Sequence, residues 1–347
     1  MISKINKLQN DNFFMDLKNK KILVTGGLGF IGSNFILKLL KESDEFEVVN
    51  VDAELHGADR RNLSEIENHE KYEFVKGNIT NKRLMEEVIS KCDLVVNFAA
   101  ESFVDRSISD ANPFLVSNIR GAFTILDIVT KQKKRMVQIS TDEVFGSLSS
   151  GTATEESKLN PSSPYAATKA AAELLINSYC ITYGSNVIIT RCTNNYGPRQ
   201  FPEKLIPKTI ILAKQEQKIP IYGKGRNIRD WIHVDDHCNG ILSLLLDGKA
   251  GQSYNISGNN EVDNTTIVKR ILDVMGKSED LIEYVEDRPG HDFRYSMNSN
   301  KISKEYGWKP KMSFGEGIEM TVEWYLNHEE IWKDLSPKIL DSTPWKN

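Results

Sequence analysis

The sequence predicts an α/β protein in which a doubly wound parallel sheet is joined to a smaller α/β lobe. In the first half of the chain, short β-rich runs alternate with segments of helical period, which is typical of a parallel sheet covered by helices. After Asn195 the texture changes, and proline, glycine and charged residues punctuate shorter elements. A chain of 347 residues is long enough to bury the core that this architecture needs.

Five strands are expected in the first half, at residues 22–25, 48–52, 94–99, 136–140 and 187–191, with helical periods at about 35–40, 113–130 and 165–183. A helix at 235–246 and a strand at 252–258 should return to the sheet. We therefore assign residues 19–195 and about 236–262 to the larger domain. The smaller domain takes about 196–235 and 263–330 and should consist mainly of loops and helices. Residues 1–18 form an N-terminal extension, and the tail after about Asn327 is expected to be peripheral.

The composition excludes several classes of protein. A net charge of −4 gives no reason to expect nucleic acid or an anionic membrane as a partner. No apolar run is long enough to span a bilayer, and the first 18 residues lack the apolar core of a secretory signal. The four cysteines are far apart and show neither metal spacing nor a disulfide pattern, so we expect no metal site and a cytoplasmic location.

The run KILVTGGLGFIGSNFILKLL indicates a strand, a glycine-rich turn and a helix. Gly26, Gly29 and Gly32 fit G-x-x-G-x-x-G, and starting from Gly27 instead gives G-x-G-x-x-G. Such glycines let backbone N–H groups approach a pyrophosphate at the start of the helix. Asp52 ends the second strand 20 residues after Gly32, where a carboxylate binds ribose hydroxyls and repels a 2′-phosphate. The sequence therefore predicts NAD rather than NADP, and Arg60 and Arg61 are interpreted as surface charges.

Tyr165 and Lys169 form a Y-x-x-x-K motif, whose spacing places both side chains on one face of a helix. A nearby ammonium should lower the pKa of the phenol, so that Tyr165 can act as a base. Ser140 and Thr141 end a predicted strand at the edge of the sheet where ligands bind. Together with the glycine turn, this combination resembles the extended short-chain dehydrogenase/reductase superfamily and its Rossmann-type fold.

Asp142 and Glu143 follow Thr141 directly, in the run STDEVFG. A dehydrogenase or epimerase of this superfamily needs only the Ser or Thr, the Tyr and the Lys. Two further carboxyl groups suit removal of a proton at one carbon and protonation of a leaving hydroxyl at the next. The pair therefore favours an elimination reaction.

Over about residues 20–327 the chain resembles the dTDP-glucose 4,6-dehydratase family. The resemblance is carried by VTGGLGFIGSN, FAAESFVDRSI, STDEVFG, PSSPYAATKAAAE, TNNYGPRQFPEKLIP, PIYGKGRNIRDWIHVDDH, YNISG and DRPGHDFRY. It implies a larger domain that binds NAD and a smaller domain that binds a nucleotide-sugar. It also implies a homodimer formed through the helices around 113–130 and 165–183.

The resemblance also implies a role for each matching residue. Thr141 would polarise the sugar O4, Asp142 would be the general acid, Glu143 the general base, and Tyr165, with Lys169, the base of the first oxidation. The cofactor-binding positions are Gly26, Gly29, Phe30, Ile31, Gly32, Asp52, Asn78, Ile79, Ala99, Ala100, Ser117, Tyr165, Lys169 and Asn195. The substrate-binding positions are Ser102, Asn194, Lys204, Leu205, Tyr222, Arg229, Asn264, Arg288 and His291. Lys and Arg are the donors that a diphosphate needs.

Some positions depart from the family pattern, and some alternatives stay open. Asn78 stands where an aspartate is usual, Phe103 and Asn97 replace histidines, and Phe145 replaces a tyrosine. A 4-epimerase or a decarboxylase is disfavoured by the adjacent Asp and Glu. A non-catalytic NAD sensor is disfavoured by the intact Tyr and Lys. A 4,6-dehydratase for a UDP-, CDP- or GDP-sugar is harder to separate, since one methyl group distinguishes dTDP from UDP and supplies only about 1–3 kcal/mol of discrimination.

Overall fold

The structure, a computed structural model, describes residues 18–42, 45–341 and 343–346. Apart from Lys18, the N-terminal extension predicted over residues 1–18 lies outside the described residues. The central element is a seven-stranded sheet in the order β10-β6-β5-β4-β1-β2-β3, and every neighbouring pair is parallel. Its strands are β1 Lys21–Thr25, β2 Glu47–Asp52, β3 Tyr72–Lys76, β4 Leu94–Asn97, β5 Arg135–Thr141, β6 Val187–Cys192 and β10 Ser253–Ile256.

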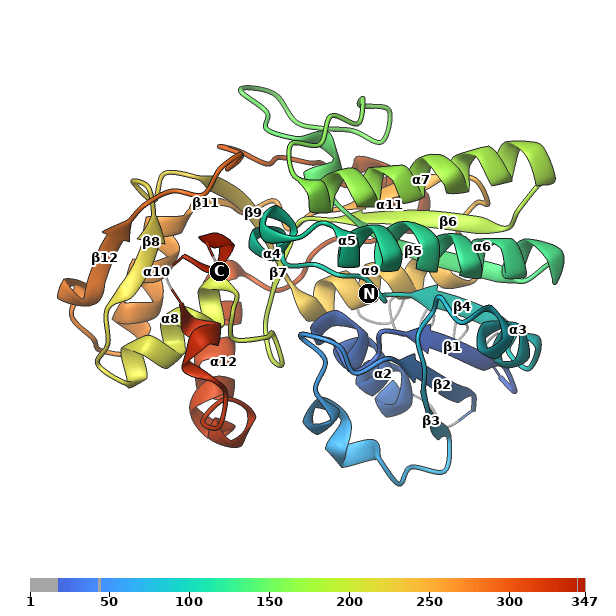
Figure 1. Ribbon diagram of the computed structural model, residues 1–347, viewed down its shortest axis with the longest axis horizontal. Coiled ribbons are helices and arrows are strands. Elements are labelled where there is room, and N and C mark those ends of the chain that lie inside the picture. Colours follow the sequence, from blue (N-terminus) through green and yellow to red (C-terminus); the bar gives the residue numbers. More distant parts are fainter. Residues whose placement is uncertain (1–17, 43–44, 342, 347) are drawn as a thin grey trace, which may run out of the picture.

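Helices cover both faces of this sheet (Figure 1). One face is covered by α2 (Phe30–Glu42), α9 (Val234–Leu245) and α11 (Asn300–Tyr306), and the other by α3 (Lys82–Ser90), α6 (Ala122–Lys131) and α7 (Pro164–Tyr183). The strands are apolar on both sides because each face is buried, as the run of fully buried Ile22, Leu23 and Val24 in β1 illustrates. The predicted fold class, a doubly wound α/β sheet, is confirmed.

The order in which the chain adds strands to the sheet reverses between β1 and β4. From β1 it builds outward to β3, then crosses over and builds β4, β5 and β6 on the other side. At such a switch point the loops at the carboxyl ends of the two central strands separate and leave a crevice for a ligand. The site described below lies at this edge.

The smaller lobe contains two small sheets in addition to helices. β7 (Asn194–Tyr196), β9 (Ile228–His233) and β11 (Glu261–Asp263) form one sheet, and β8 (Ile219–Tyr222) pairs with β12 (Ile282–Val285). Their helices are α8 (Leu205–Lys214), α10 (Asn264–Val274) and α12 (Phe314–Asn327), which share an apolar core. The lobe is α/β, as its predicted class states, but the expectation of mainly loops and helices was wrong, because strands of three to six residues among prolines and glycines carry little periodic signal.

Three other details differ from the prediction. The edge strand β3 was missed, because its five residues, YEFVK, are too few to show a clear alternation of polar and apolar side chains. The single helix expected at 113–130 is α5 (Asn112–Phe114), a π-helical turn at Leu115–Gly121, and α6. Ile302 and Trp308 were assigned to the smaller domain, yet both lie in the core beneath the large sheet.

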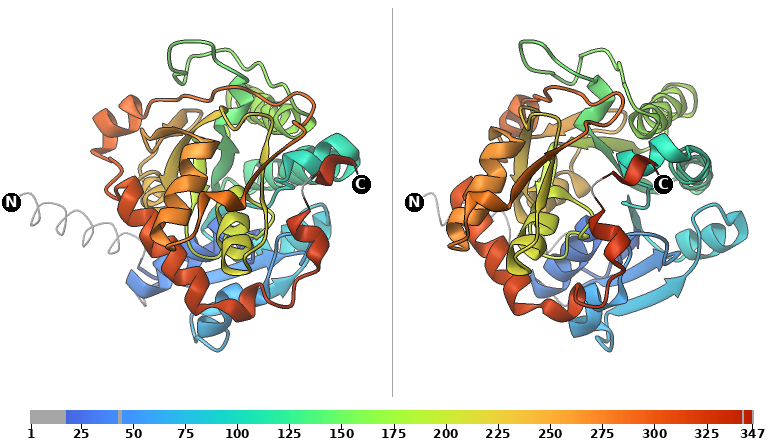
Figure 2. Two further views of the ribbon diagram at one scale, coloured as in Figure 1. Left: turned by 90° about the vertical axis from the view of Figure 1, so that its left-hand side faces the viewer. Right: turned by 60° about the vertical axis from the view of Figure 1, so that its left-hand side comes forward.

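The tail after Asn327 is not peripheral, and this expectation was wrong. Ile331 and Trp332 are buried, and Trp332 Nε1 donates to the carbonyl of Tyr325 at 3.0 Å. Trp345 is only 8% exposed, and its carbonyl accepts from Ser109 Oγ of α4 (Val104–Ser109) at 3.3 Å. The C-terminal turn that carries Trp345 lies against this helix, beside the end marked C in Figure 2. The tail thus joins the smaller lobe to a helix of the large one. Within the part of the chain that the structure describes, no helix has the length and apolar character to cross a membrane.

Candidate active site

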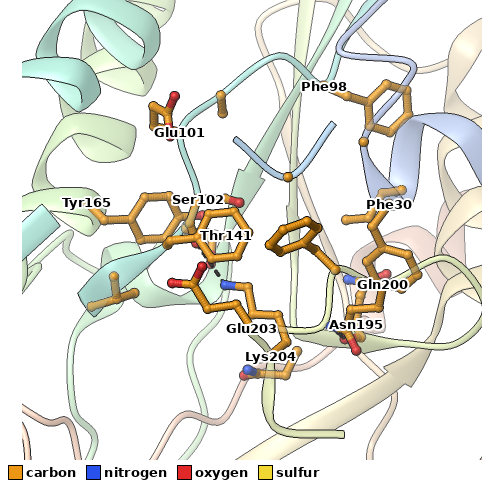
Figure 3. A pocket seen from close by; sticks show the side chains of 18 of the residues that line it. Phe30, Phe98, Glu101, Ser102, Thr141, Tyr165, Asn195, Gln200, Glu203 and Lys204 are labelled. Carbon is orange, nitrogen blue, oxygen red and sulfur yellow. Dashed lines mark hydrogen bonds between the residues drawn. The ribbon is translucent and has the colours of Figure 1, made fainter. Parts of the chain in front are cut away.

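A single cavity between the two lobes is lined by every site residue predicted from the sequence. It opens at the carboxyl edge of the large sheet and takes its lining from both lobes (Figure 3). The predicted catalytic residues in its wall are Thr141, Asp142, Glu143, Tyr165 and Lys169. The predicted cofactor positions in it are Gly26, Gly29, Phe30, Ile31, Gly32, Asp52, Asn78, Ile79, Ala99, Ala100, Ser117 and Asn195. The predicted substrate positions in it are Ser102, Asn194, Lys204, Leu205, Tyr222, Arg229, Asn264, Arg288 and His291.

The glycine turn forms a cradle that no larger residue would permit. Gly26 has a φ of +71°, and a Cβ on Gly32 would lie 2.4 Å from the carbonyl oxygen of Gly26. Helix α2 starts at Phe30, so its first N–H groups face the cavity. A helix N-terminus with open backbone in front of it is the surface that a pyrophosphate needs.

Asp52 ends β2 beside this turn and is 6% exposed. Its carboxylate accepts from the N–H groups of Leu28, at 3.0 Å, and Glu54, at 2.8 Å. Burial raises the pKa of Asp52, while these two hydrogen bonds lower it. Asn78 is similarly fixed, because its Oδ1 accepts from the N–H of Thr80 at 2.9 Å. Both side chains are held by neighbouring backbone and face the dinucleotide half of the cavity.

The π-helical turn brings Ser117 to the cavity wall. The next residue, Asn118, donates to the carbonyl of Glu101 and to Thr168 Oγ1, both at 3.0 Å, and accepts from the N–H of Glu101 at 2.9 Å. Asn118 therefore ties the loop after β4 to helix α7. π-Helical turns are frequent at functional sites, and here the turn joins two walls of the cavity.

Thr141, Asp142 and Glu143 lie where β5 ends and a 3₁₀ turn begins. Thr141 Oγ1 donates to Asp142 Oδ1 at 3.1 Å and accepts from the N–H of Glu143 at 3.3 Å. Asp142 is 3% exposed, and its Oδ2 has no partner among the described residues. Such a carboxyl is costly to ionise.

The two carboxyl groups differ in their surroundings. Burial, and then the charge of Glu143, raises the pKa of Asp142 well above its usual range. Burial also raises the pKa of Glu143, but the charges of Arg288, Lys204 and Arg229 oppose that shift. Asp142 is therefore suited to stay protonated while Glu143 ionises, which is the arrangement an acid–base pair requires.

Tyr165 and Lys169 occupy the first turns of α7. Ser163 caps this helix by accepting from the N–H of Ala166 at 3.1 Å, and Pro164 follows at the first helical position. Lys169 Nζ donates to the carbonyl of Ile139 at 2.6 Å, and burial lowers the pKa of Lys169 to about 8. The expected lowering of the Tyr165 pKa is not found: burial, and then the charge of Glu143, raises it well above its usual value.

The raised pKa of Tyr165 has a physical cause. The phenol is 8% exposed and lies beside carboxylates, and the Lys169 ammonium is engaged by a backbone carbonyl. A phenolate therefore needs a further positive charge close to the ring. The positively charged nicotinamide ring of NAD⁺ is a group of that kind.

The cations of the substrate half lie in the cavity wall and are buried or half-buried. Lys204 Nζ donates to the carbonyl of Ser102 at 2.9 Å and lies 4.5 Å from the centre of the Phe103 ring. Arg288 pairs with Asp105 at 2.7 Å, and its buried Nε has no partner among the described residues. Such an unpaired donor fits an anionic ligand.

Arg229 and Tyr222 frame the same half. The Arg229 guanidinium donates to the carbonyl of Asp292 at 2.9 Å and lies 4.2 Å from the centre of the Tyr295 ring. Hydrogen bonds to backbone carbonyl groups therefore hold the Arg229 guanidinium. An arginine on the surface would instead be held by an ion pair. Tyr222 donates to Asp105 at 3.0 Å. His291 is paired with Asp287 at 2.6 Å.

Sequence reasoning missed other residues that line the cavity, among them His56, Glu101 and Asp105. Two more lie directly beside predicted site residues. Tyr295 lines the cavity, donates to Asp292 at 2.6 Å and lies 3.4 Å from Glu143 Oε2. Glu203 lines it too, next to Lys204. Both fall inside motifs that carried the family resemblance, DRPGHDFRY and FPEKLIP, and that was the only signal that could have found them.

The family model described as GDP-mannose 4,6 dehydratase matches residues 23–321 of the chain. The chain belongs to this 4,6-dehydratase family. A dTDP-glucose 4,6-dehydratase of Streptomyces niveus is 43% identical over 330 residues, which cover 93% of this chain and 98% of that protein. The low-salt glycan biosynthesis protein Agl12 of Haloferax volcanii is 46% identical over 310 residues, covering 89% of this chain and 99% of Agl12.

A solved structure gives the same result. The crystal structure of a dTDP-glucose 4,6-dehydratase from Bacillus anthracis in complex with NAD has a TM-score of 0.86 and 45% sequence identity. The match covers 91% of this chain and all of that one. The family predicted from the sequence is confirmed, and the cavity is the candidate active site for 4,6-dehydration.

Proposed function

We propose that this 4,6-dehydratase converts dTDP-glucose to dTDP-4-keto-6-deoxy-glucose, with NAD as a cofactor that is regenerated in place. The observation that carries the proposal is the meeting of Thr141, Asp142 and Glu143 with Tyr165 and Lys169 in one cavity that also contains a dinucleotide cradle. The NAD in the B. anthracis relative supports the choice of cofactor.

The cofactor would be held by the glycine turn, the start of α2 and the carboxylate of Asp52. Bound NAD supplies a reversible hydride acceptor, which oxidises the sugar at C4 first and reduces it at C6 last. We also propose that residues 19–195 with about 236–262 form the domain that holds it, and that about 196–235 and 263–330 hold the nucleotide-sugar.

The chain's own residues then divide the proton transfers. Thr141 orients the sugar O4, and Tyr165 takes its proton during oxidation. The resulting C4 ketone acidifies the hydrogen at C5, which Glu143 removes. Asp142, kept protonated by burial, gives a proton to O6, and water leaves. Glu143 returns its proton to C5 when C6 is reduced, and the proton that Tyr165 took from O4 restores the acid form of Asp142, so the overall reaction is loss of one water molecule.

Substitution of each carboxyl group tests this assignment. Asp142→Asn and Glu143→Gln keep the size of each side chain but cannot give or take the proton, so each should lower turnover of dTDP-glucose by about 10²–10⁴-fold. Bound NAD should be retained in both, as measured by the absorbance of cofactor released on denaturation. Formation of the 4-keto sugar is followed by its absorbance in alkali. Turnover at the parental rate in both variants would remove the assignment.

The choice of nucleotide is tested separately. The cavity offers Lys204, Arg229 and Arg288 to a diphosphate whatever base it carries. The parent protein should therefore be assayed with dTDP-, UDP-, CDP- and GDP-linked sugars side by side. We expect the highest kcat/KM with dTDP-glucose, and a higher value for another nucleotide would transfer the proposal to that substrate.

A homodimer is part of the proposal. The outer sides of α6 and α7, with the π-helical turn between α5 and α6, carry six large exposed apolar side chains: Leu115, Val116, Phe123, Leu174, Ile181 and Tyr183. Exposed apolar patches on neighbouring helices mark sites of association, and a second copy of this chain offers the same face. A cytoplasmic location is proposed as well, since all four cysteines are free thiols.

A further inference from the structure

The loop between β7 and α8, residues 197–204, crosses from the smaller lobe onto the dinucleotide half of the cavity. Near its start, the carbonyl of Pro198 accepts from Asn34 of α2 at 2.9 Å. Arg199 donates to the carbonyl of Asn62 at 3.1 Å and to Glu65 at 2.8 Å. The loop is therefore attached to the large lobe beside the helix whose N-terminus faces the cavity.

The far end of the loop is attached by Glu203. Its carboxylate lies 2.6 Å from His56 Nε2, on the loop that follows Asp52, and 3.2 Å from the Nε of Arg106. The side chain of Glu203 is 6% exposed and that of His56 is 24% exposed. Both residues line the cavity. His56 and Glu203 are 147 positions apart in the sequence, so their contact joins two separate walls of the site.

Aromatic rings fix the geometry of this contact. The His56 ring meets Phe103 edge-on at 4.7 Å and Phe201 at 4.9 Å, and the two phenylalanines are 5.7 Å apart. The adjacent Gly57 has a φ of +86°, and a Cβ there would lie 2.9 Å from the Phe103 ring. The backbone around His56 is therefore shaped to bring this ring against the cluster.

The charged residues around Glu203 favour the ionised form of its carboxyl group. Although burial raises the pKa of Glu203, the hydrogen bond and charge of His56, together with Arg106 and Lys204, hold it below its usual value. A charge-assisted hydrogen bond at a largely buried position is among the stronger polar contacts in a protein.

We propose that the His56–Glu203 contact, which we call the clasp, keeps loop 197–204 closed over the dinucleotide half of the cavity and so slows the release of NAD. The inference rests on the proposed function, because a reaction that returns its hydride within each turnover has no need to exchange the cofactor. His56 and Glu203 act here on the residence of the cofactor rather than on the proton transfers.

The test measures cofactor release directly. The parent protein and His56→Phe are loaded with NADH, mixed with excess NAD, and followed by the fluorescence of bound NADH. Phenylalanine keeps the ring between Phe103 and Phe201 but removes the nitrogen that contacts Glu203. Release should become about tenfold faster, the change expected from losing one hydrogen bond to a charged group. His56→Gln, which keeps a donor, should show a smaller acceleration.

Arg60→Gln is the matched control. Arg60 follows the same loop but lies outside the cavity lining, and it should release NADH at the parental rate. Circular dichroism checks that each variant is folded. Parental release rates in both His56 variants would overturn the clasp even if the parent dehydrates dTDP-glucose. Faster release from a variant that folds like the parent would support the clasp even if the parent turns over no nucleotide-sugar. The clasp and the proposed function can therefore be contradicted independently.

Discussion

At the residue scale, the site depends on carboxyl groups that the fold keeps away from water. Asp142 is buried with one oxygen unpartnered among the described residues, and Glu143 lies beside three cations. The sequence predicted both residues from their adjacency to Thr141. The family resemblance also gave them opposite roles, Asp142 as the acid and Glu143 as the base. The local sequence could not show what favours the ionised form of Glu143, because Arg288 and Lys204 act on it from distant parts of the chain. The same holds for Tyr165, whose pKa is raised by burial rather than lowered by Lys169.

Asp142→Asn should stabilise the fold while it lowers turnover. Because the pKa of Asp142 is raised in the folded state above its ordinary value of 3.8, the folded protein binds more protons than the unfolded chain at higher pH. The stability that the protonated Asp142 carboxyl contributes to the fold is therefore fully present when the pH is below the ordinary pKa. It is lost as the pH rises toward the raised pKa. The variant's advantage over the parent should therefore grow as the pH rises toward neutral.

Urea denaturation at several values between about pH 4 and about pH 8 measures this difference. Glu283→Gln, at an exposed position of β12, is the control and should show no such trend. A variant that is less stable than the parent at neutral pH would contradict the raised pKa of Asp142.

At the element scale, helix α7 carries the catalytic pair and is anchored one turn beyond it. Glu173 follows Lys169 by four residues and forms a fully buried ion pair with Arg191 of β6 at 2.7 Å, with side-chain exposures of 0% and 4%. Arg191 also lies 4.9 Å from the centre of the Phe145 ring. The helix itself was predictable from its period and its Ser-Pro start, but the anchor was not, since nothing in the local sequence pairs Glu173 with a strand residue.

Glu173→Gln should lower the free energy of unfolding by about 3–5 kcal/mol, since it leaves the charge of Arg191 buried without compensation. Turnover should fall too, because Tyr165 and Lys169 lie on the same helix. The matched control is Glu87→Gln, which breaks the exposed Glu87–Lys91 pair at the end of α3 and should leave the free energy of unfolding almost unchanged. Equal losses in the two variants by denaturant titration would show that the buried pair is not an anchor.

At the scale of the whole molecule, the two lobes are joined by more than the chain crossings between them. Strand β3 and helices α3 and α11 were missed, but the other six strands of the large sheet, its remaining helices and the position of the cavity were predicted from alternation and glycine placement. The small sheets and the path of the tail were not, because they depend on contacts such as Trp345 against Tyr222, whose rings lie 4.8 Å apart. These two residues are far apart in sequence and belong to no motif in common.

Trp345→Ala should weaken substrate binding. Its ring meets Tyr222 edge-on, and Tyr222 in turn donates to Asp105, the partner of Arg288. Loss of an aromatic pair of this kind costs about 0.5–1.5 kcal/mol, so KM for the nucleotide-sugar should rise several-fold with a smaller change in kcat. Lys346→Gln removes only an exposed ion pair with Glu286 in the same tail and should leave KM unchanged. An unchanged KM in Trp345→Ala would separate the tail from the site.

Ile181→Glu tests the dimer. Ile181 is 86% exposed on α7, and a charge at the centre of an apolar contact between copies should prevent association. Sedimentation equilibrium should give a dimer for the parent and a monomer for the variant. Glu156→Gln, at an exposed position outside α7, is the control. A monomeric parent would remove the proposed homodimer.

The strand β10 and the helix α9 have a consequence for how the protein is made. Both lie in the second half of the chain, yet Tyr254, Ile256, Ile241 and Leu244 are completely buried in the core of the large sheet. On the ribosome, β6 must therefore wait as an edge strand, paired only with β5, until some sixty further residues have emerged. A gene fragment that stops near codon 195 should yield aggregates, and an isolated cofactor domain would have to be assembled by splicing the distant segment back onto β6.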